Sequence, residues 1–260
     1  MSYETIKTRN EGPALIIELS RHDKRNAVNV QMMDEIVSVF HEVEDRKDVS
    51  AIIMTGGIEY FSAGADLNEA FEVDSAQKGR RYFGHWHRLN DTLEQSSKPV
   101  IAAIEGFCMT GGLELALAAD LRVASQKSTF AITSARIGTV AGAGGTQRLP
   151  RVVGLSNALD ILFNAEPFDA NEALRVGLIN RLVPDGTALE VAVGMAKHYA
   201  TRAPLSLAFV KRAVHRGMQM DLASAIEFET MLVTTVYGTK DKAEGISAFL
   251  EKRKAQFKGE

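Results

Sequence analysis

The sequence predicts an α/β protein with a helical C-terminal region. Short apolar stretches at 14–19, 51–55 and 100–104 have the length and composition of buried strands. Between the first two, apolar residues recur at helical spacing over 33–43. From about residue 204, helical patterns follow one another without intervening strands. Strands that alternate with helices indicate a layered α/β core, and the final run of helices indicates an extension of that core.

Length, composition and charge limit the possible functions. The chain has 260 residues, of which 45% are hydrophobic, and a formal net charge of -3. It can therefore bury one large core with a helical appendage, and we place the division at 1–195 and 196–260. The charge lacks the basic character of nucleic-acid-binding proteins. A single cysteine, Cys108, excludes an internal disulfide and fits a reducing compartment. Because neither a secretory signal nor a membrane-spanning stretch is visible, we expect a cytoplasmic protein with no nucleic-acid or membrane partner.

The remaining elements follow in chain order. The mixed-charge region 68–81 matches no regular element, and the region 138–154 is rich in glycine. Further elements are expected as a helix at 82–95, strands at 121–124 and 130–132, and helices beginning at Pro204 and covering 226–236 and 243–257.

A glycine turn followed by a carboxylate carries the most informative chemistry. The run Gly106–Leu115 leads into Leu115–Ala119, which is apolar on every side and is expected to form a buried helix. Glu114 falls in its first turn, where a carboxylate removed from water needs a proton, a partner or a function. The N–H groups of Gly111 and Gly112 leave room for a ligand oxygen, and the helix dipole favours negative charge there. Enolate chemistry needs this combination of an anion-stabilising pocket and a tunable acid.

Five segments in order resemble the crotonase superfamily, also called the enoyl-CoA hydratase/isomerase family. They are Asp23–Ala27, Phe61–Leu67, Lys98–Glu114, Gly138–Arg148 and Ala248–Phe257. Each segment alone is a weak signal, but the five together span nearly the whole chain. The resemblance implies a ClpP-like crotonase spiral of ββα units, with C-terminal helices that assemble homotrimers, often paired into hexamers.

The resemblance also implies the substrate and the binding residues. The substrate class is acyl-CoA thioesters, so coenzyme A arrives with the substrate, and neither a separate cofactor nor a metal is expected. The backbone N–H groups of Ala65 and Gly111 match those that hold the thioester oxygen. The positions that match coenzyme A contacts are Arg25, Ala27, Ala63, Ala65, Asp66, Leu67 and Asn68. Phe249 and Lys252 resemble positions that reach the ligand of a neighbouring subunit.

The sequence departs from the family at one catalytic position. Typical hydratases of the family use two glutamates, one as base while the other carries a proton. The first is Glu114 here, but the second position is Ser134. A serine hydroxyl can orient water but does not titrate near neutral pH. The isomerases that rely on one glutamate usually keep the second position, so the sequence matches neither pattern.

Several reactions therefore stay open. We favour hydration of a 2-enoyl-CoA in which Glu114 is the acid and base and Ser134 or Thr133 holds the water. Isomerisation by a proton shuttle on Glu114, or decarboxylation of an acyl-CoA, are the alternatives on the same site, and Arg136 could pair with a substrate carboxylate. Outside catalysis, the retained Glu114 argues against a mere CoA-thioester binder, and the acidic balance argues against an RNA-binding relative. Ser134 alone motivates the idea of a branched or ring-derived substrate.

Other suggestive residues favour simpler interpretations. His85 and His87 are two residues apart on a helix and so point in different directions, which argues against a metal pair. The glycine runs lack the full nucleotide-binding fingerprints. Cys108 is expected to be inert packing, and Lys252–Lys254 are expected to form a solvated helix end.

Overall fold

The computed structural model describes residues 3–260 and has a six-stranded sheet at its centre. The strand order is β1-β2-β3-β4-β6-β9, with β1 antiparallel to β2 and every other pair parallel. The strands are β1 (Ile6–Glu11), β2 (Ala14–Leu19), β3 (Ala51–Thr55), β4 (Val100–Ile104), β6 (Leu121–Ser125) and β9 (Arg181–Val183). The three strands expected first from the sequence, β2, β3 and β4, are confirmed and adjacent.

A smaller sheet continues from the first. It consists of β5 (Phe107–Met109), β7 (Thr129–Ala131) and β8 (Phe168–Asp169), with β5 and β7 parallel. Gly106 makes the turn from β4 to β5 with a φ of 54°, and a Cβ there would lie 2.0 Å from the carbonyl oxygen of Glu59. Only glycine fits at this turn.

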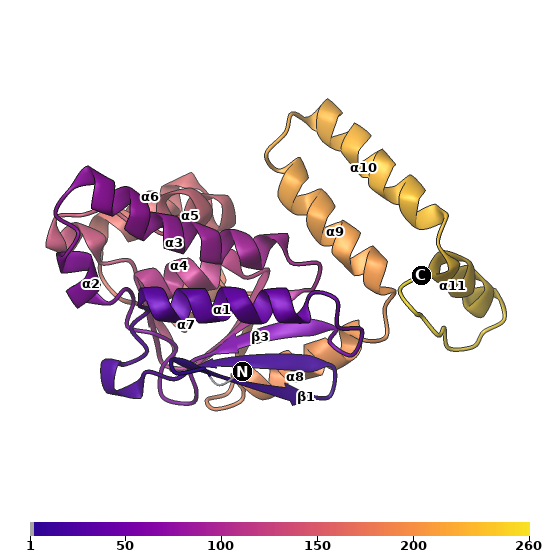
Figure 1. Cartoon of the computed structure of the whole chain (residues 1–260), viewed down its shortest axis with the longest axis horizontal. Coiled ribbons are helices and arrows are strands. Elements are labelled where there is room, and N and C mark those ends of the chain that lie inside the picture. Colours follow the sequence, from indigo (N-terminus) through magenta and orange to yellow (C-terminus); the bar gives the residue numbers. More distant parts are fainter. Residues whose placement is uncertain (1–2) are drawn as a thin grey trace.

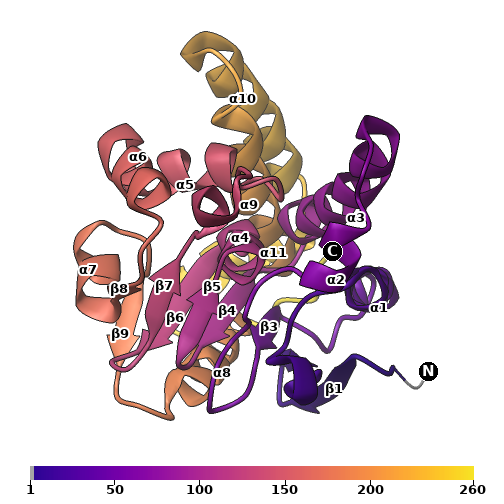
Figure 2. The same cartoon turned by 90° about the vertical axis from the view of Figure 1, so that its left-hand side faces the viewer.

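Helices cover both faces of the large sheet. On one face lie α1 (Val30–Val43), α3 (Ala76–Gln95) and α4 (Gly111–Ala118), and on the other lies α8 (Ala188–Tyr199). Figure 2 shows α4 above the strands and α8 below them. Strand residues alternate between the two cores: Ala102 faces the α1 side, whereas Ile101 and Ala103 face α8. This two-sided burial explains why the central strands are apolar at successive positions.

Side-chain caps define helices that the sequence left unassigned. The region 68–81 contains most of α2 (Leu67–Phe71), capped by Asp66, and the start of α3. The Ser75 side chain accepts a hydrogen bond from the Lys78 amide, so α3 begins at Ala76, six residues before the expected start. The glycine-rich stretch also hides helical structure, because α5 (Gly145–Val153) begins within it.

Four further elements complete the core. They are α6 (Leu155–Asn164), α7 (Ala170–Arg175) and two 3₁₀ turns, η1 (His22–Lys24) and η2 (Ser134–Ile137). The division drawn at residues 195 and 196 lies inside α8, and it stays a proposal.

The last three helices leave the core. Figure 1 shows α9 (Pro204–Gly217), α10 (Leu222–Tyr237) and α11 (Lys240–Leu250) projecting away from the sheet layers. The Lys211 ammonium anchors α9, because it donates to the carbonyl oxygens of Leu93 and Lys98 and pairs with Asp120 at 2.9 Å. The α/β fold with a helical extension is confirmed.

The end of the chain corrects one expectation. The helix expected at 243–257 ends at Leu250, and Lys252 has a φ of 55°. Lys252–Lys254 therefore lie beyond the helix instead of forming its solvated end. Asp241 instead holds the tail in place by accepting the amide hydrogen atoms of Lys258 and Gly259. No helix within residues 3–260 combines the length and apolar character needed to cross a bilayer.

Candidate active site

Two backbone amides meet at the start of α4. Gly111 is its first residue, and Ala65 lies in the loop before α2. The Met109 amide donates to the Ser62 carbonyl oxygen at 3.0 Å and aligns the two loops. A Cβ on Gly111 would lie 2.8 Å from the Ala65 nitrogen, so the missing side chain keeps this space open. Neither amide has an acceptor within residues 3–260. The structure thus brings the two nitrogens close together, and their role as donors to a thioester oxygen stays a prediction.

Glu114 lies one helical turn from Gly111 on the same helix. Residues three apart share a helix face, and every residue of α4 is buried. Glu114 itself is 3% exposed. The Gly145 amide, at the start of α5, donates to its Oε1 atom at 2.8 Å. A Cβ on Gly145 would lie 2.9 Å from that oxygen, so this contact also requires glycine.

Burial controls the titration of Glu114. Desolvation raises its pKa from 4.5 to about 7, although the Gly145 and Ala143 amides and the charge of Arg148 act in the opposite direction. At neutral pH both protonation states are therefore populated, and the group can accept and return a proton.

Ser134 is brought to the same end of α4. It opens η2 and is 5% exposed. Thr133 and Thr110 approach each other through their hydroxyls at 2.9 Å, and Thr110 directly precedes Gly111. The Thr110 backbone has a φ of 43°, a conformation that is costly for a β-branched residue and that recurs at functional sites.

Arg136 is engaged elsewhere. It forms an ion pair with Glu166 at the surface. Whether Arg136 binds a carboxylate of the substrate stays a question that this surface pair does not decide.

The two segments expected to bind coenzyme A are hydrogen-bonded to each other. The Ala63 amide donates to the Arg25 carbonyl oxygen at 3.0 Å, and Val28 pairs with Ala65 as an isolated bridge. Asp66 forms an ion pair with Arg21 at 2.9 Å. Burial disfavours the charged Asp66, but the bonds from Arg21 and from the Asn68 amide outweigh it and lower its pKa. The segments of Arg25–Ala27 and Ala63–Asn68 thus form one surface next to the Ala65 amide.

The two C-terminal positions lie apart from this surface. Phe249 is 83% exposed, and Lys252 is exposed just beyond α11. In Figure 1 α11 lies on the opposite side of the molecule from α4. Within one chain they do not join the site, and contact with a neighbouring subunit stays a prediction.

Comparisons with known proteins show the family of the chain. The sequence model described as enoyl-CoA hydratase/isomerase matches residues 9–260. The chain belongs to the enoyl-CoA hydratase/isomerase family. The short-chain-enoyl-CoA hydratase of Clostridium acetobutylicum is 35% identical over 98% of both chains. The 2,3-dehydroadipyl-CoA hydratase of Escherichia coli is 36% identical over 98% of this chain and 99% of its own. The crystal structure of enoyl-CoA hydratase from Bacillus anthracis superimposes with a TM-score of 0.93 at 31% identity, over 99% of this chain and 100% of that chain.

Family membership confirms the resemblance, the crotonase fold and the enzyme class. Two supporting residues of this family member escaped the sequence analysis. Trp86 packs against Gly111, since a Cβ there would lie 3.0 Å from the indole ring. Gly145 anchors Glu114 from the segment Gly138–Arg148, which the sequence matched to the family without any role for Gly145. The spacing of glycines without a nucleotide fingerprint was the available signal for Gly145, whereas nothing local marked Trp86.

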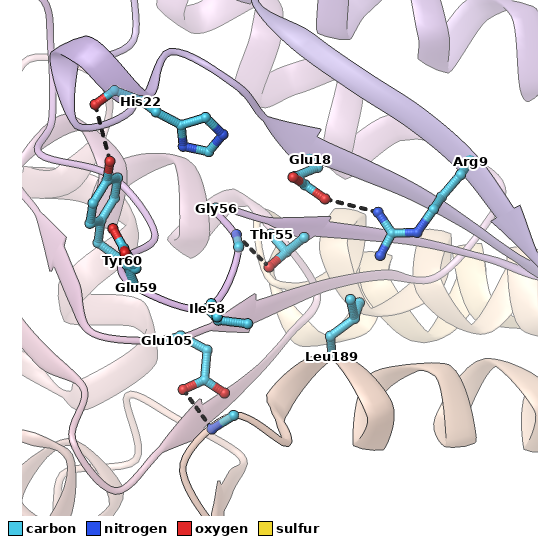
Figure 3. Close-up of a pocket in the computed structure, with 12 residues that line it drawn as sticks. Arg9, Glu18, His22, Thr55, Gly56, Ile58, Glu59, Tyr60, Glu105 and Leu189 are labelled. Atoms are coloured by element: carbon cyan, nitrogen blue, oxygen red, sulfur yellow. Dashed lines mark hydrogen bonds and ion pairs between the residues drawn. The ribbon is translucent and has the colours of Figure 1, made fainter.

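A cavity of about 430 Å³ lies on the other face of the sheet. Figure 3 shows Glu18, Thr55 and Glu105, from the ends of β2, β3 and β4, around it. Strand alternation puts these side chains on the α8 side, whereas Glu114 belongs to the α1 side. Glu105 is occupied by the amides of Gly186 and Ala188 at the start of α8. This cavity is therefore separate from the candidate active site.

The remaining candidates keep their simpler interpretations. His85 approaches Asp34 at 3.2 Å. No group of three or more metal-ligating side chains occurs among residues 3–260. Cys108 is fully buried, and its desolvation raises the pKa of the thiol well above the usual range, so it stays protonated and unreactive.

Proposed function

We propose that this enzyme adds water to 2-enoyl-CoA thioesters, with Glu114 as the acid and base. One observation carries the proposal: the unpaired amides of Ala65 and Gly111 lie beside the helix turn that buries Glu114 with a pKa of about 7. Hydratases at 34–36% identity over nearly the full chain support the same reaction.

The two amides can stabilise the negative charge that develops on the thioester during the reaction. When water adds to the β-carbon, negative charge moves onto the thioester oxygen. The Ala65 and Gly111 N–H groups lie close together without acceptors, and in this proposal both donate to the thioester oxygen and stabilise the enolate. Loss of one such donor typically lowers turnover by about 10²–10³-fold.

One carboxyl group can complete the proton transfers. The Glu114 carboxylate takes a proton from water as the water oxygen bonds to the β-carbon. The same proton then passes from Glu114 to the α-carbon as the enolate returns to a thioester. The sum is addition of one water, and Glu114 ends ionised as it began. The Ser134 hydroxyl orients the attacking water without titrating.

The substrate carries its own coenzyme A, and this acid-base chemistry needs no separate cofactor. We assign the surface formed by Arg25–Ala27 and Ala63–Asn68 to the coenzyme A part, since it borders the Ala65 amide. A cytoplasmic location stays a prediction from the sequence.

We further propose a homotrimer or a dimer of trimers. The helices that project in Figure 1 expose large apolar side chains that one chain leaves uncovered. They include Val210, Val214, Met218, Leu222, Ile226, Met231, Tyr237 and Phe249. Light scattering on the purified protein should give the mass of three or six chains, and a monomer at micromolar concentration would contradict this proposal.

Mass spectrometry of the product tests the reaction. Incubation with crotonyl-CoA should increase the thioester mass by one water. Glu114→Gln should abolish turnover while CoA-thioester affinity is largely kept. Glu105→Gln is the matched control, because Glu105 is equally buried but lies on the other face of the sheet. Near-normal turnover by Glu114→Gln would remove Glu114 from the mechanism.

Isomerisation is the second candidate, because Ser134 leaves the site with one carboxyl group, although the one-glutamate isomerases of the family usually keep the other position. A site with one carboxyl group can move a proton between two carbons without water. A conversion that leaves the thioester mass unchanged would indicate this reaction. The Ser134→Glu variant further distinguishes hydration from isomerisation. A restored second carboxylate should raise the rate at which short enoyl-CoAs are hydrated. It should impair a reaction that needs the serine.

A further inference from the structure

Asn90 is a completely buried polar residue on α3. Its Nδ2 atom donates a hydrogen bond to the Ala143 carbonyl oxygen at 2.7 Å. Its Oδ1 atom is buried and has no hydrogen-bond partner among residues 3–260. The two ends of this amide cannot be exchanged, because two acceptor oxygens would then face each other. A half-satisfied amide is costly in a core, and an apolar side chain would avoid that cost. Packing alone therefore explains Asn90 poorly, and the bond to Ala143 indicates its role.

The Ala143 carbonyl belongs to the loop that binds Glu114. Two residues later, the Gly145 amide donates to Oε1 of Glu114 at 2.8 Å. Between them lies Gly144, whose φ of 99° is in the left-handed region that favours glycine. Glycine restricts backbone rotation very little, so the direction of the Gly145 amide depends on what holds the peptide before it. The bond from Asn90 holds that peptide by its carbonyl oxygen.

One face of α3 holds this loop on both sides of Ala143. Phe83 packs directly on Gly142, since a Cβ on that glycine would lie 2.4 Å from the phenyl ring. Glu94 binds the Arg148 guanidinium through two hydrogen bonds of 2.6 and 3.1 Å. Phe83 and Glu94 lie about two turns before and one turn after Asn90, so the three side chains share a face of the helix. The helix α3 is therefore the support against which the loop is fixed.

Two ionisable groups on neighbouring helices act together with Glu114. Arg148, on α5, lowers the pKa of Glu114, and its Nη1 atom makes a longer bond of 3.5 Å to the Ala143 oxygen. Tyr82, on α3, interacts electrostatically with Glu114, but burial raises the pKa of its phenol, which stays neutral at neutral pH. Neither group supplies a donor in place of the Gly145 amide. The loop backbone is therefore what Asn90 can control.

We propose that Asn90 is a positioning residue for Glu114, because its bond to the Ala143 carbonyl keeps the Gly145 amide directed at the carboxylate. The inference rests on the proposed function in that Glu114 is taken as the acid and base. The Gly145 and Ala143 amides both lower the pKa of Glu114. Without Asn90 the loop can turn these amides away, and the carboxylate then loses donors and binds its proton more tightly.

The pH profile of crotonyl-CoA turnover by two Asn90 variants tests the inference. Asn90→Ala removes the donor and leaves space, whereas Asn90→Leu removes the donor and fills the space. Both should move the midpoint of kcat to higher pH by about one unit, the effect of one hydrogen bond to a charged group. At pH 7 kcat should fall about fivefold, because the ionised fraction of Glu114 falls from about a half to about a tenth. KM should change by less than about twofold, since other segments are assigned to coenzyme A.

Leu89→Ala is the matched control. Leu89 precedes Asn90 on α3 and is just as buried, but neighbouring residues of a helix point in different directions. This variant should lower stability in urea without moving the pH midpoint of kcat. Hydrogen exchange measured by mass spectrometry tests the contact without any turnover. Both Asn90 variants should exchange the amides of 142–148 about tenfold faster than the wild type, whereas Leu89→Ala should not accelerate this segment selectively.

The outcomes separate this inference from the proposed function. A pH midpoint that stays in place in both Asn90 variants overturns the inference, even if kcat falls, because the residue would then serve packing only. Failure of both variants to fold overturns it for the same reason. If the wild type does not convert crotonyl-CoA, the proposed function fails, and the exchange of 142–148 then decides the inference by itself. Unchanged exchange of that segment in both variants would show that Asn90 does not hold the loop.

Discussion

Replacement of Glu114 by glutamine should change how the stability of this enzyme depends on pH. Glutamine keeps an oxygen for the Gly145 amide and has nearly the same volume, but it cannot ionise. The wild-type carboxyl has a pKa of about 7 in the folded protein against a usual 4.5. Below pH 4.5 it is protonated in both the folded and the unfolded chain, so ionisation does not separate the two proteins.

The sign and size of the effect follow from linkage. Between pH 4.5 and 7 the unfolded chain releases the proton and the folded chain keeps it, so the wild-type free energy of unfolding falls as pH rises. At 1.36 kcal/mol per pH unit, the total loss is about 3 kcal/mol once the pH exceeds 7. The glutamine of Glu114→Gln cannot ionise, so the free energy of unfolding of this variant does not fall in this way. The variant should therefore gain about 3 kcal/mol on the wild type between pH 4.5 and pH 8.

Urea unfolding of both proteins at half-unit steps from pH 5 to pH 8 measures this difference. The pH dependence of crotonyl-CoA turnover by the wild type should show a group that titrates near pH 7. A constant stability difference between the two proteins over this range would refute the argument, because it would mean that Glu114 ionises in the folded protein as readily as in water.

Three other substitutions test neighbouring parts of the structure. Gly111→Ala would place a methyl group 2.8 Å from the Ala65 nitrogen, and crotonyl-CoA turnover should fall about 10²–10³-fold while circular dichroism stays unchanged. Gly145→Ala would crowd Oε1 of Glu114 and weaken the amide bond that lowers its pKa, so the pH profile of the remaining activity should move to higher pH. Lys211→Met would leave its buried partners unpaired at the base of α9, and urea unfolding should show a loss of about 3–5 kcal/mol.

Local patterns in the sequence predicted the central strands and the buried acid. The strands β2, β3 and β4 are continuous apolar runs because both faces of the sheet are covered. The first turn of α4 was recognisable because glycines precede a wholly apolar helix. In each case the physical cause acts over a few residues and so is visible in the sequence.

Long-range contacts explain what the sequence did not show. Oε1 of Glu114 is bound by an amide 31 residues away, and the Trp86 ring reaches Gly111 from a different helix. The Tyr82 hydroxyl is buried without a hydrogen-bond partner among residues 3–260, and this depends on the positions of all the neighbouring elements. The early end of α11 at Leu250 reflects a tail held by Asp241, again a contact distant in sequence.

The burial of Glu114 connects the stability of the protein to its chemistry. An exposed glutamate, with a pKa near the usual 4.5, would be a weaker base toward water at neutral pH. The same desolvation that lowers stability above pH 7 holds the carboxyl at the point where both forms coexist. In the proposed hydration Ser134 supplies no second acid, so this one group must fill both roles. A variant that re-exposed Glu114 to water should therefore become more stable at pH 8 and slower in hydration, and a variant that gained in both would break the connection.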